Sequence, residues 1–167
     1  LQTMQEAAAQ AVHTEAFLQL YRALRAEGLA PVVVKGIVCR ARYPQPDLRP
    51  SGDEDLYLAP EEMPRFHAVL LRAGFVLTEP ERDYRTAHEA RYVQPRTGLV
   101  VEGHWALFPT EYEVYTALNA QLTGLEERAQ DWETGGVTLR IPDPSDHLIF
   151  LLLHAFKHFV SSGVGVR

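Results

Sequence analysis

The stretch Gly52-Asp53-Glu54-Asp55-Leu56-Tyr57-Leu58 combines an alternating strand pattern with two closely spaced aspartates. Successive side chains of a β-strand point to opposite faces, so Asp53 and Asp55 are expected on one face and Glu54 on the other. Two like charges this close repel each other, and a divalent cation is the usual remedy. Mg²⁺ commonly takes one or two carboxylates together with substrate phosphates. The alternative is a solvated strand face, because Asp-X-Asp alone is common.

The region before these aspartates carries a glycine turn and positive charge. Gly36 follows the β-branched run Pro31-Val32-Val33-Val34 and precedes a brief expected helix, a geometry in which backbone amides receive phosphate oxygens. A turn alone also explains such a glycine. The basic residues of the region, within fifteen positions that contain a single acid, are Lys35, Arg40, Arg42 and Arg49. They suit a small anionic substrate, with an ordinary solvated loop as the alternative.

A third carboxylate comes from the segment Val100-Val101-Glu102-Gly103-His104-Trp105. An acid in an otherwise apolar strand is expensive to bury unless it is paired or binds a metal, and an exposed edge strand is the alternative. Glu102 therefore joins the two aspartates as a candidate metal ligand. His104, two positions further, is a candidate accessory residue on the same face. A phosphate turn, positive charge and three carboxylates are the parts that phosphoryl-type transfer needs.

The pattern along the chain predicts an α/β (α+β) fold, with a mixed sheet flanked by helices. Helices are expected at 5–27, after Gly36 and through Cys39, from Pro60 to Ala73, from the capping-box spacing at Thr110 to about residue 130, and from Pro144 through Phe159. Strands are expected at 31–34, 53–58, 75–77, 86–94, 99–105 and 137–141. Residues 1–142 are expected to form the sheet-containing domain, and residues 143–167 to begin a C-terminal helical region. Because the chain stops at Gly163–Arg167 without a cap, we expect more helical protein beyond it.

The composition, 46% hydrophobic and 23% charged residues, is that of an ordinary globular domain. The longest apolar run, Leu148–Leu153, is too short to cross a bilayer, so no membrane partner is expected. The single Cys39 suits a reducing cytoplasm, which is the expected location. The net charge of −6 argues against extended nucleic-acid binding, because neutralising phosphates requires many Lys and Arg.

Three histidines, His147, His154 and His158, share one stripe of the last expected helix. His154 and His158, four positions apart, have the spacing of a transition-metal pair, but the helix lacks the glutamate of a His-Glu-X-X-His site. We favour hydrogen-bonding or packing histidines. A metal-dependent hydrolase built on this pair is the alternative.

These motifs together resemble a known family. The segments Lys35-Gly36, Arg49–Leu56, Val101–Trp105 and Leu152–His158 are similar to those of the uncharacterised nucleotidyltransferases, a branch of the DNA polymerase β-like nucleotidyltransferase superfamily. The resemblance extends from about residue 15 onward. It implies transfer of a nucleoside monophosphate from a nucleoside triphosphate to an unidentified acceptor, with release of pyrophosphate and with Mg²⁺ or Mn²⁺ as cofactor.

The same resemblance assigns roles to residues. It implies that Asp53, Asp55 and Glu102 are catalytic metal ligands and that Glu102 also serves as general base. The residues that it implies in nucleotide binding are Lys35, Gly36, Arg49, Ser51 and Gly52.

The sequence departs from the superfamily pattern at three points. Gly36 is followed by Ile37 where Gly-Ser or Gly-Gly is usual, which favours an alternative: a nucleotide-binding or regulatory module without catalysis. Glu54 replaces an apolar residue, for which the two explanations are a side chain that faces solvent and a strand less buried than in relatives. Gly103 also replaces an apolar residue, and is expected to loosen the strand that presents Glu102.

Overall fold

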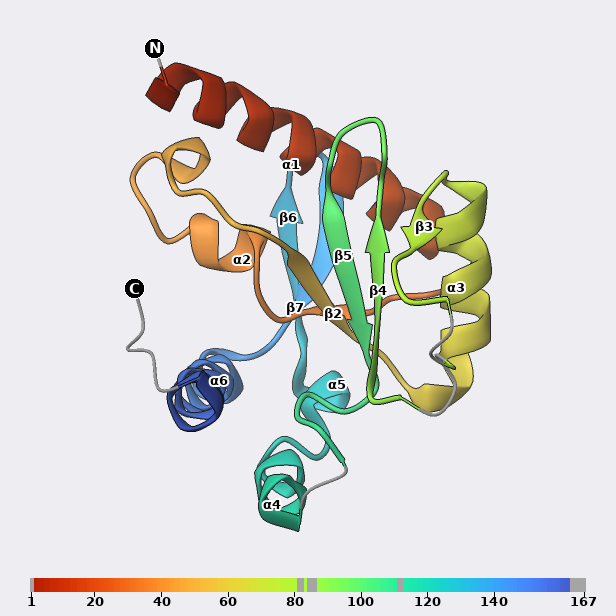
Figure 1. Ribbon diagram of the computed structural model, residues 1–167, viewed down its shortest axis with the longest axis vertical. Helices are drawn as coiled ribbons and strands as arrows, with labels where there is room; N and C mark the ends of the chain where they lie inside the picture. The colour runs from red at the N-terminus through yellow and green to blue at the C-terminus, as the bar shows by residue number, and fades with distance from the viewer. Residues whose placement is uncertain (1, 81–82, 84–86, 111–112, 163–167) are drawn as a thin grey trace.

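The computed structural model describes residues 2–80, 83, 87–110 and 113–162. Within these residues a mixed sheet of seven strands forms in the order β3-β4-β5-β2-β1-β7-β6, flanked by helices (Figure 1). The strands are β1 (Val32–Val33), β2 (Glu54–Tyr57), β3 (Val76–Leu77), β4 (Glu89–Val93), β5 (Val100–His104), β6 (Gln130–Thr134) and β7 (Val137–Ile141). The helices are α1 (Gln2–Ala26), α2 (Ile37–Arg40), α3 (Met63–Arg72), α4 (Glu113–Gln121), α5 (Leu125–Arg128) and α6 (Pro144–Ser162), with 3-10 turns η1 (Pro46–Leu48) and η2 (Pro60–Glu62). This α+β architecture confirms the predicted fold class.

The middle of the sheet brings two distant carboxylate segments side by side. β2 pairs in parallel with β5, and Asp55 lies opposite Glu102 while Tyr57 lies opposite His104. On its other side β2 pairs antiparallel with β1, which runs parallel to β7. Because partners in register point to the same face, the side chains of Asp55, Glu102 and His104 share one face of the sheet.

The opposite face packs against α1 and α3. The larger apolar core joins these helices to the sheet through residues that include Phe17, Leu20, Tyr21, Leu24, Leu56, Phe66, Leu70, Tyr92, Val101 and Leu139. The hydroxyl of Tyr21 donates to the carbonyl of Pro31 at 2.8 Å and accepts from the amide of Arg140 at 3.0 Å. These bonds fix α1 to the region where β1 and β7 meet.

A smaller core lies on the face that carries the carboxylates. It joins β1 to α5 and α6 through residues that include Val32, Val34, Phe108, Leu125 and Phe150. In Figure 1, α4 and α6 lie at the end of the view away from α1. Among the described residues, no helix is both long and apolar enough to cross a membrane.

The helix predicted from residue 110 to about 130 is wrong in its second half. α4 ends at Gln121, and α5 is a single turn. The edge strand β6, which begins at Gln130 and lies beside β7, was not predicted. Gly135 and Gly136 join β6 to β7 with φ angles of 53° and 69°, the positive values that a two-residue hairpin turn requires. The other predicted elements are present with shifted ends.

Some predicted features fall outside the described residues. These are Glu111 and Tyr112 of the capping-box spacing, Thr86 at the start of the predicted strand 86–94, and the terminal segment 163–167.

Candidate functional site

A cavity of about 260 Å³ gathers the carboxylates of β2 and β5. Its lining residues are Lys35, Asp53, Asp55, Glu89, Glu102, His104, Leu107, Phe150, His154, Lys157 and His158. A larger hollow of about 430 Å³ lies between α1 and the β4–β5 turn, but no carboxylate lines it. The smaller cavity is the candidate site, because convergent titratable groups mark function better than volume does.

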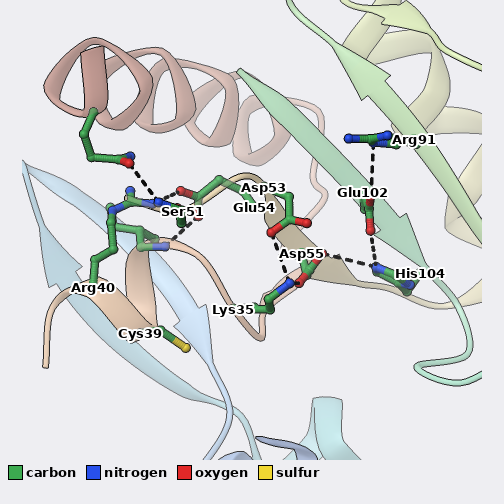
Figure 2. Close-up of polar contacts among 12 residues, drawn as sticks. Lys35, Cys39, Arg40, Ser51, Asp53, Glu54, Asp55, Arg91, Glu102 and His104 are labelled. Atoms are coloured by element: carbon green, nitrogen blue, oxygen red, sulfur yellow. Dashed lines mark hydrogen bonds and ion pairs between the residues drawn. The ribbon is translucent and has the colours of Figure 1, made fainter. Parts of the chain in front are cut away.

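Lys35 forms ion pairs with both Asp53, which precedes β2, and Asp55, which lies on β2. Its Nζ donates to Asp53 Oδ1 at 3.1 Å and lies 3.1 Å from Asp55 Oδ2 (Figure 2). Burial would lower the pKa of Lys35, but the two carboxylates outweigh it and raise the pKa above its ordinary value. The ammonium therefore stays charged near neutral pH and offsets the repulsion between the aspartates.

Glu102 and Asp55 lie side by side yet differ in proton affinity. Glu102, with 21% of its side chain exposed, contacts Arg91 Nε through Oε1 at 3.2 Å and His104 Nε2 through Oε2 at 3.7 Å (Figure 2). Burial and the charge of Asp55 raise the pKa of Glu102 to about 7. Burial would also raise the pKa of Asp55, but His104 and Lys35 hold it below its ordinary range. Glu102 is thus the carboxylate suited to accept a proton.

His104 is buried between three carboxylates. Only 8% of its side chain is exposed, and its Nε2 lies 3.5 Å from Asp55 Oδ1. Its Nδ1 lies 3.5 Å from Oε2 of Glu89, the cross-strand neighbour of His104 on β4. Burial would lower the pKa of His104, but Asp55, Glu89 and Glu102 outweigh it and raise the pKa. Glu89 was not predicted as a site residue, although the register of the predicted hairpin could have placed it opposite His104.

Helix α6 supplies another wall of the cavity. Phe150, His154, Lys157 and His158 form one stripe of this helix, and all four line the cavity. His154 packs on Phe150 with ring centroids 5.5 Å apart and meets His158 edge to face at 4.6 Å. Burial and nearby Lys35 lower the pKa of His154 to about 4, so its ring is neutral at physiological pH. His154 and His158 therefore pack against each other, and they also line the cavity that holds the carboxylates.

The explanation that Glu54 faces solvent is wrong. Its side chain is 1% exposed, and Arg40, equally buried, donates to Glu54 Oε1 at 2.7 Å (Figure 2). Arg40 also donates to the hydroxyls of Ser51 and Thr14. A carboxylate replaces an apolar residue here because a buried guanidinium compensates it. The pair ties α1, α2 and the loop before β2 to the sheet.

The turn at Gly36 packs against the Glu54 carboxylate. The backbone amide of Ile37, which was expected to face phosphate, donates to Glu54 Oε2 at 2.7 Å. Gly36 has a φ of 69°, and a side chain there would collide with the Glu54 carboxylate. Gly36 therefore permits the packing of Glu54, and the turn is built around an internal anion.

The remaining predicted nucleotide-binding residues lie outside the cavity lining. The guanidinium of Arg49 lies over the ring of Tyr43, 5.2 Å from its centroid. Ser51 receives the Arg40 guanidinium on its hydroxyl and donates its amide to Gln10 Oε1 at 3.0 Å. Gly52, which precedes Asp53, is exposed.

Gly103 has a packing role beside Glu102. A Cβ at this position would lie 2.5 Å from Cε1 of Phe66, so the glycine admits the ring of α3 against β5. The close packing of Phe66, rather than a loosening of the strand, explains why a glycine occupies this position.

One ligand atom from each of Asp55, Glu102 and His104 lies within 4.8 Å of the other two, a spacing that suits one metal ion. Carboxylate oxygens are the donors that Mg²⁺ and Mn²⁺ take, so the set fits the expected cofactor. Asp53 lies beside the group, joined to it through Lys35. Among the described residues, the His154–His158 pair is not part of this group.

The uncharacterised nucleotidyltransferase family matches this chain over residues 1–167. The chain belongs to this family. No curated protein and no solved structure gives a significant match. Membership confirms the resemblance seen in the sequence motifs and supports a role in nucleotidyl transfer.

Proposed function

We propose that this family member transfers a nucleoside monophosphate from a nucleoside triphosphate to an acceptor, with Mg²⁺ or Mn²⁺ held by Asp53, Asp55 and Glu102. The observation that carries the proposal is the pairing of Asp55 with Glu102 in a cavity that Lys35 shares. Family membership supports the class of reaction. When bound, the cation supplies charge neutralisation to the triphosphate and to the leaving pyrophosphate.

The chain's own residues account for the proton and for part of the charge. An acceptor oxygen bonds to the α-phosphorus as the bond from that phosphorus to the pyrophosphate oxygen breaks. Glu102 takes the acceptor's proton, a role supported by its position beside Asp55 in the cavity. Lys35 exchanges part of its contact with the aspartates for triphosphate oxygens.

One observation favours the alternative of a binding or regulatory module. The amide of Ile37 donates to Glu54, so the turn does not offer this amide to a phosphate. A module of this kind binds triphosphate at the same carboxylates without releasing pyrophosphate.

Calorimetric titration of ATP and the other nucleoside triphosphates, with Mg²⁺ and with EDTA, tests the proposal. The Asp53→Asn/Asp55→Asn double variant removes two charges without changing side-chain size. The Asp47→Asn/Asp131→Asn double variant removes the same charge from exposed positions and is its control. We expect binding that requires Mg²⁺ and both site aspartates. Equal binding by the site variant, or no binding by folded wild-type protein, would refute the site.

A pyrophosphate-release assay over a panel of hydroxyl-bearing acceptors then separates the enzyme from the alternative. Release that depends on Glu102, tested with Glu102→Gln, supports nucleotidyl transfer. Tight binding without release supports the regulatory module.

A further inference from the structure

We propose that His104 is itself a metal ligand through Nε2, and that the site therefore selects a first-row transition-metal dication, such as Mn²⁺, over Mg²⁺. The inference rests on the proposed function, because it concerns the metal of that same site. It adds a nitrogen donor to a site that the family resemblance describes with carboxylates alone.

The surroundings of His104 call for a further partner. The side chain is more than nine-tenths buried, and within the described residues neither ring nitrogen makes a hydrogen bond. Its Nε2 lies 3.5 Å from Asp55 Oδ1 and 3.7 Å from Glu102 Oε2, beyond the usual length of about 2.7–3.2 Å for an N–H···O bond. Buried polar atoms are normally satisfied, and a shared cation satisfies all three groups at once.

The Nδ1 atom of the ring faces a carboxylate, as the second nitrogen of a metal-bound histidine does, at ion-pair distance rather than hydrogen-bond length. Such histidines direct their second nitrogen to a carboxylate or carbonyl, which fixes the ring and its tautomer. Here Nδ1 lies 3.5 Å from Glu89 Oε2. Strand pairing holds Glu89 opposite His104, and His88 Nε2 lies 3.2 Å from the same Glu89 oxygen. The ring is thus oriented from behind while Nε2 faces Asp55 and Glu102.

The donor set decides which metal is favoured. Mg²⁺ takes oxygen ligands in near-ideal octahedral geometry and keeps several waters. Mn²⁺ shares the preference of Mg²⁺ for oxygen ligands but accepts an imidazole nitrogen more readily, and the later first-row dications accept it more readily still. Two carboxylates and one imidazole therefore shift the preference of the site away from Mg²⁺.

A histidine that only pairs with the carboxylates as an imidazolium is the competing explanation. It predicts no bond from the ring nitrogen to a metal. Pulsed electron paramagnetic resonance distinguishes the two, because a directly bound nitrogen modulates the Mn²⁺ spin echo. Folded wild-type protein is measured with Mn²⁺ alone and with Mn²⁺ plus α,β-methylene ATP, an analogue that cannot lose pyrophosphate.

We expect nitrogen modulation in the wild type, altered when the histidines are labelled with ¹⁵N and lost in His104→Gln. Glu89→Gln keeps the modulation but weakens Mn²⁺ binding by about 10- to 100-fold, the usual effect of losing an outer carboxylate. His104→Gln weakens Mn²⁺ binding at least as much and affects Mg²⁺ less, so the preference for Mn²⁺ narrows. The control is His13→Gln, on α1 against the β4–β5 turn, which changes neither quantity.

Several results would overturn the inference. They are Mn²⁺ bound without nitrogen modulation, modulation that persists in His104→Gln, wild-type protein that binds Mg²⁺ as tightly as Mn²⁺, and no Mn²⁺ binding at all. The wild-type spectrum stands even if His104→Gln fails to fold. If the spectrum lacks nitrogen while triphosphate binding still requires both aspartates, His104 is not a ligand and the proposed function survives. If folded protein binds neither cation nor triphosphate, the proposed function fails as well.

Discussion

Removing one partner of the buried Arg40–Glu54 pair is expected to cost a large fraction of the free energy of unfolding. Both side chains are 1% exposed, and the 2.7 Å ion pair is the main compensation for the Glu54 charge. The other is the amide of Ile37, also at 2.7 Å. Arg40→Met leaves a carboxylate buried with one neutral donor, and stranding a buried charge costs about 3–5 kcal/mol. A domain of this kind is stable by about 5–15 kcal/mol in total.

Urea denaturation followed by circular dichroism measures the effect, with Arg40→Met, Glu54→Leu and the double variant forming a cycle. The double variant should lose far less than the sum of the singles, because apolar residues can replace a buried pair at little cost. Arg72→Met is the control: it breaks a 2.8 Å pair with Glu27 in which both side chains are over half exposed, worth about 0–1 kcal/mol. A loss below about 1 kcal/mol for Arg40→Met would refute the reasoning.

Three further outcomes are expected. Lys35→Met removes a cation from between the aspartates. Calorimetry should therefore show tighter binding of Mn²⁺ alone and weaker binding of Mg²⁺–ATP. Weaker binding of both would contradict this. Gly103→Ala should cost about 1–3 kcal/mol by crowding Phe66, and a partial rescue by Phe66→Leu in urea unfolding would confirm the contact. Burial lowers the pKa of His147, so the imidazole binds a proton more readily in the unfolded chain than in the folded one. The free energy of unfolding should therefore fall as the pH drops below 6.5. In His147→Gln it should depend less on pH over that range.

Local patterns predicted most of the fold, and they failed where a strand is exposed. Alternation located β2, and a Pro-Gly-bounded hairpin located β4 and β5. β6 was not predicted, because Gln130, Asp131 and Glu133 are exposed at the edge of the sheet and leave no run of apolar residues to mark a strand. The Gly135-Gly136 pair between Trp132 and Val137 was the available signal. The sheet order has no local signature, because it depends on contacts between distant segments.

Only those features of the site that depend on strand alternation and motif spacing could be predicted from the sequence. Alternation correctly set Asp55 apart from Glu54, and Glu102 beside His104. It could not show that Glu54 is buried, because its compensation comes from Arg40, fourteen positions earlier on another element. It also could not place His154 in the cavity, since the packing of α6 over the sheet is a tertiary contact.

The placement of positive charge distinguishes two accounts of triphosphate binding. The sequence pointed to the turn at Gly36 and to Arg49, but the turn's amide donates to Glu54 and Arg49 stacks on Tyr43. Among the described residues, the ammonium groups that line the cavity are those of Lys35 and Lys157. We therefore expect Lys35 and Lys157, rather than the loop before β2, to contact the phosphates.

Lys157→Met and Arg49→Met therefore make a matched pair, each removing one cation. A hydrogen bond to a charged group contributes about 1.5–3 kcal/mol, so loss of Lys157 should weaken Mg²⁺–ATP binding by about 10- to 100-fold. Loss of Arg49 should have a much smaller effect, because its guanidinium lies outside the cavity lining. Calorimetric titration of both variants measures the difference. If Arg49→Met weakens binding more than Lys157→Met, the phosphates lie along the loop before β2, and α6 serves only to cover the site.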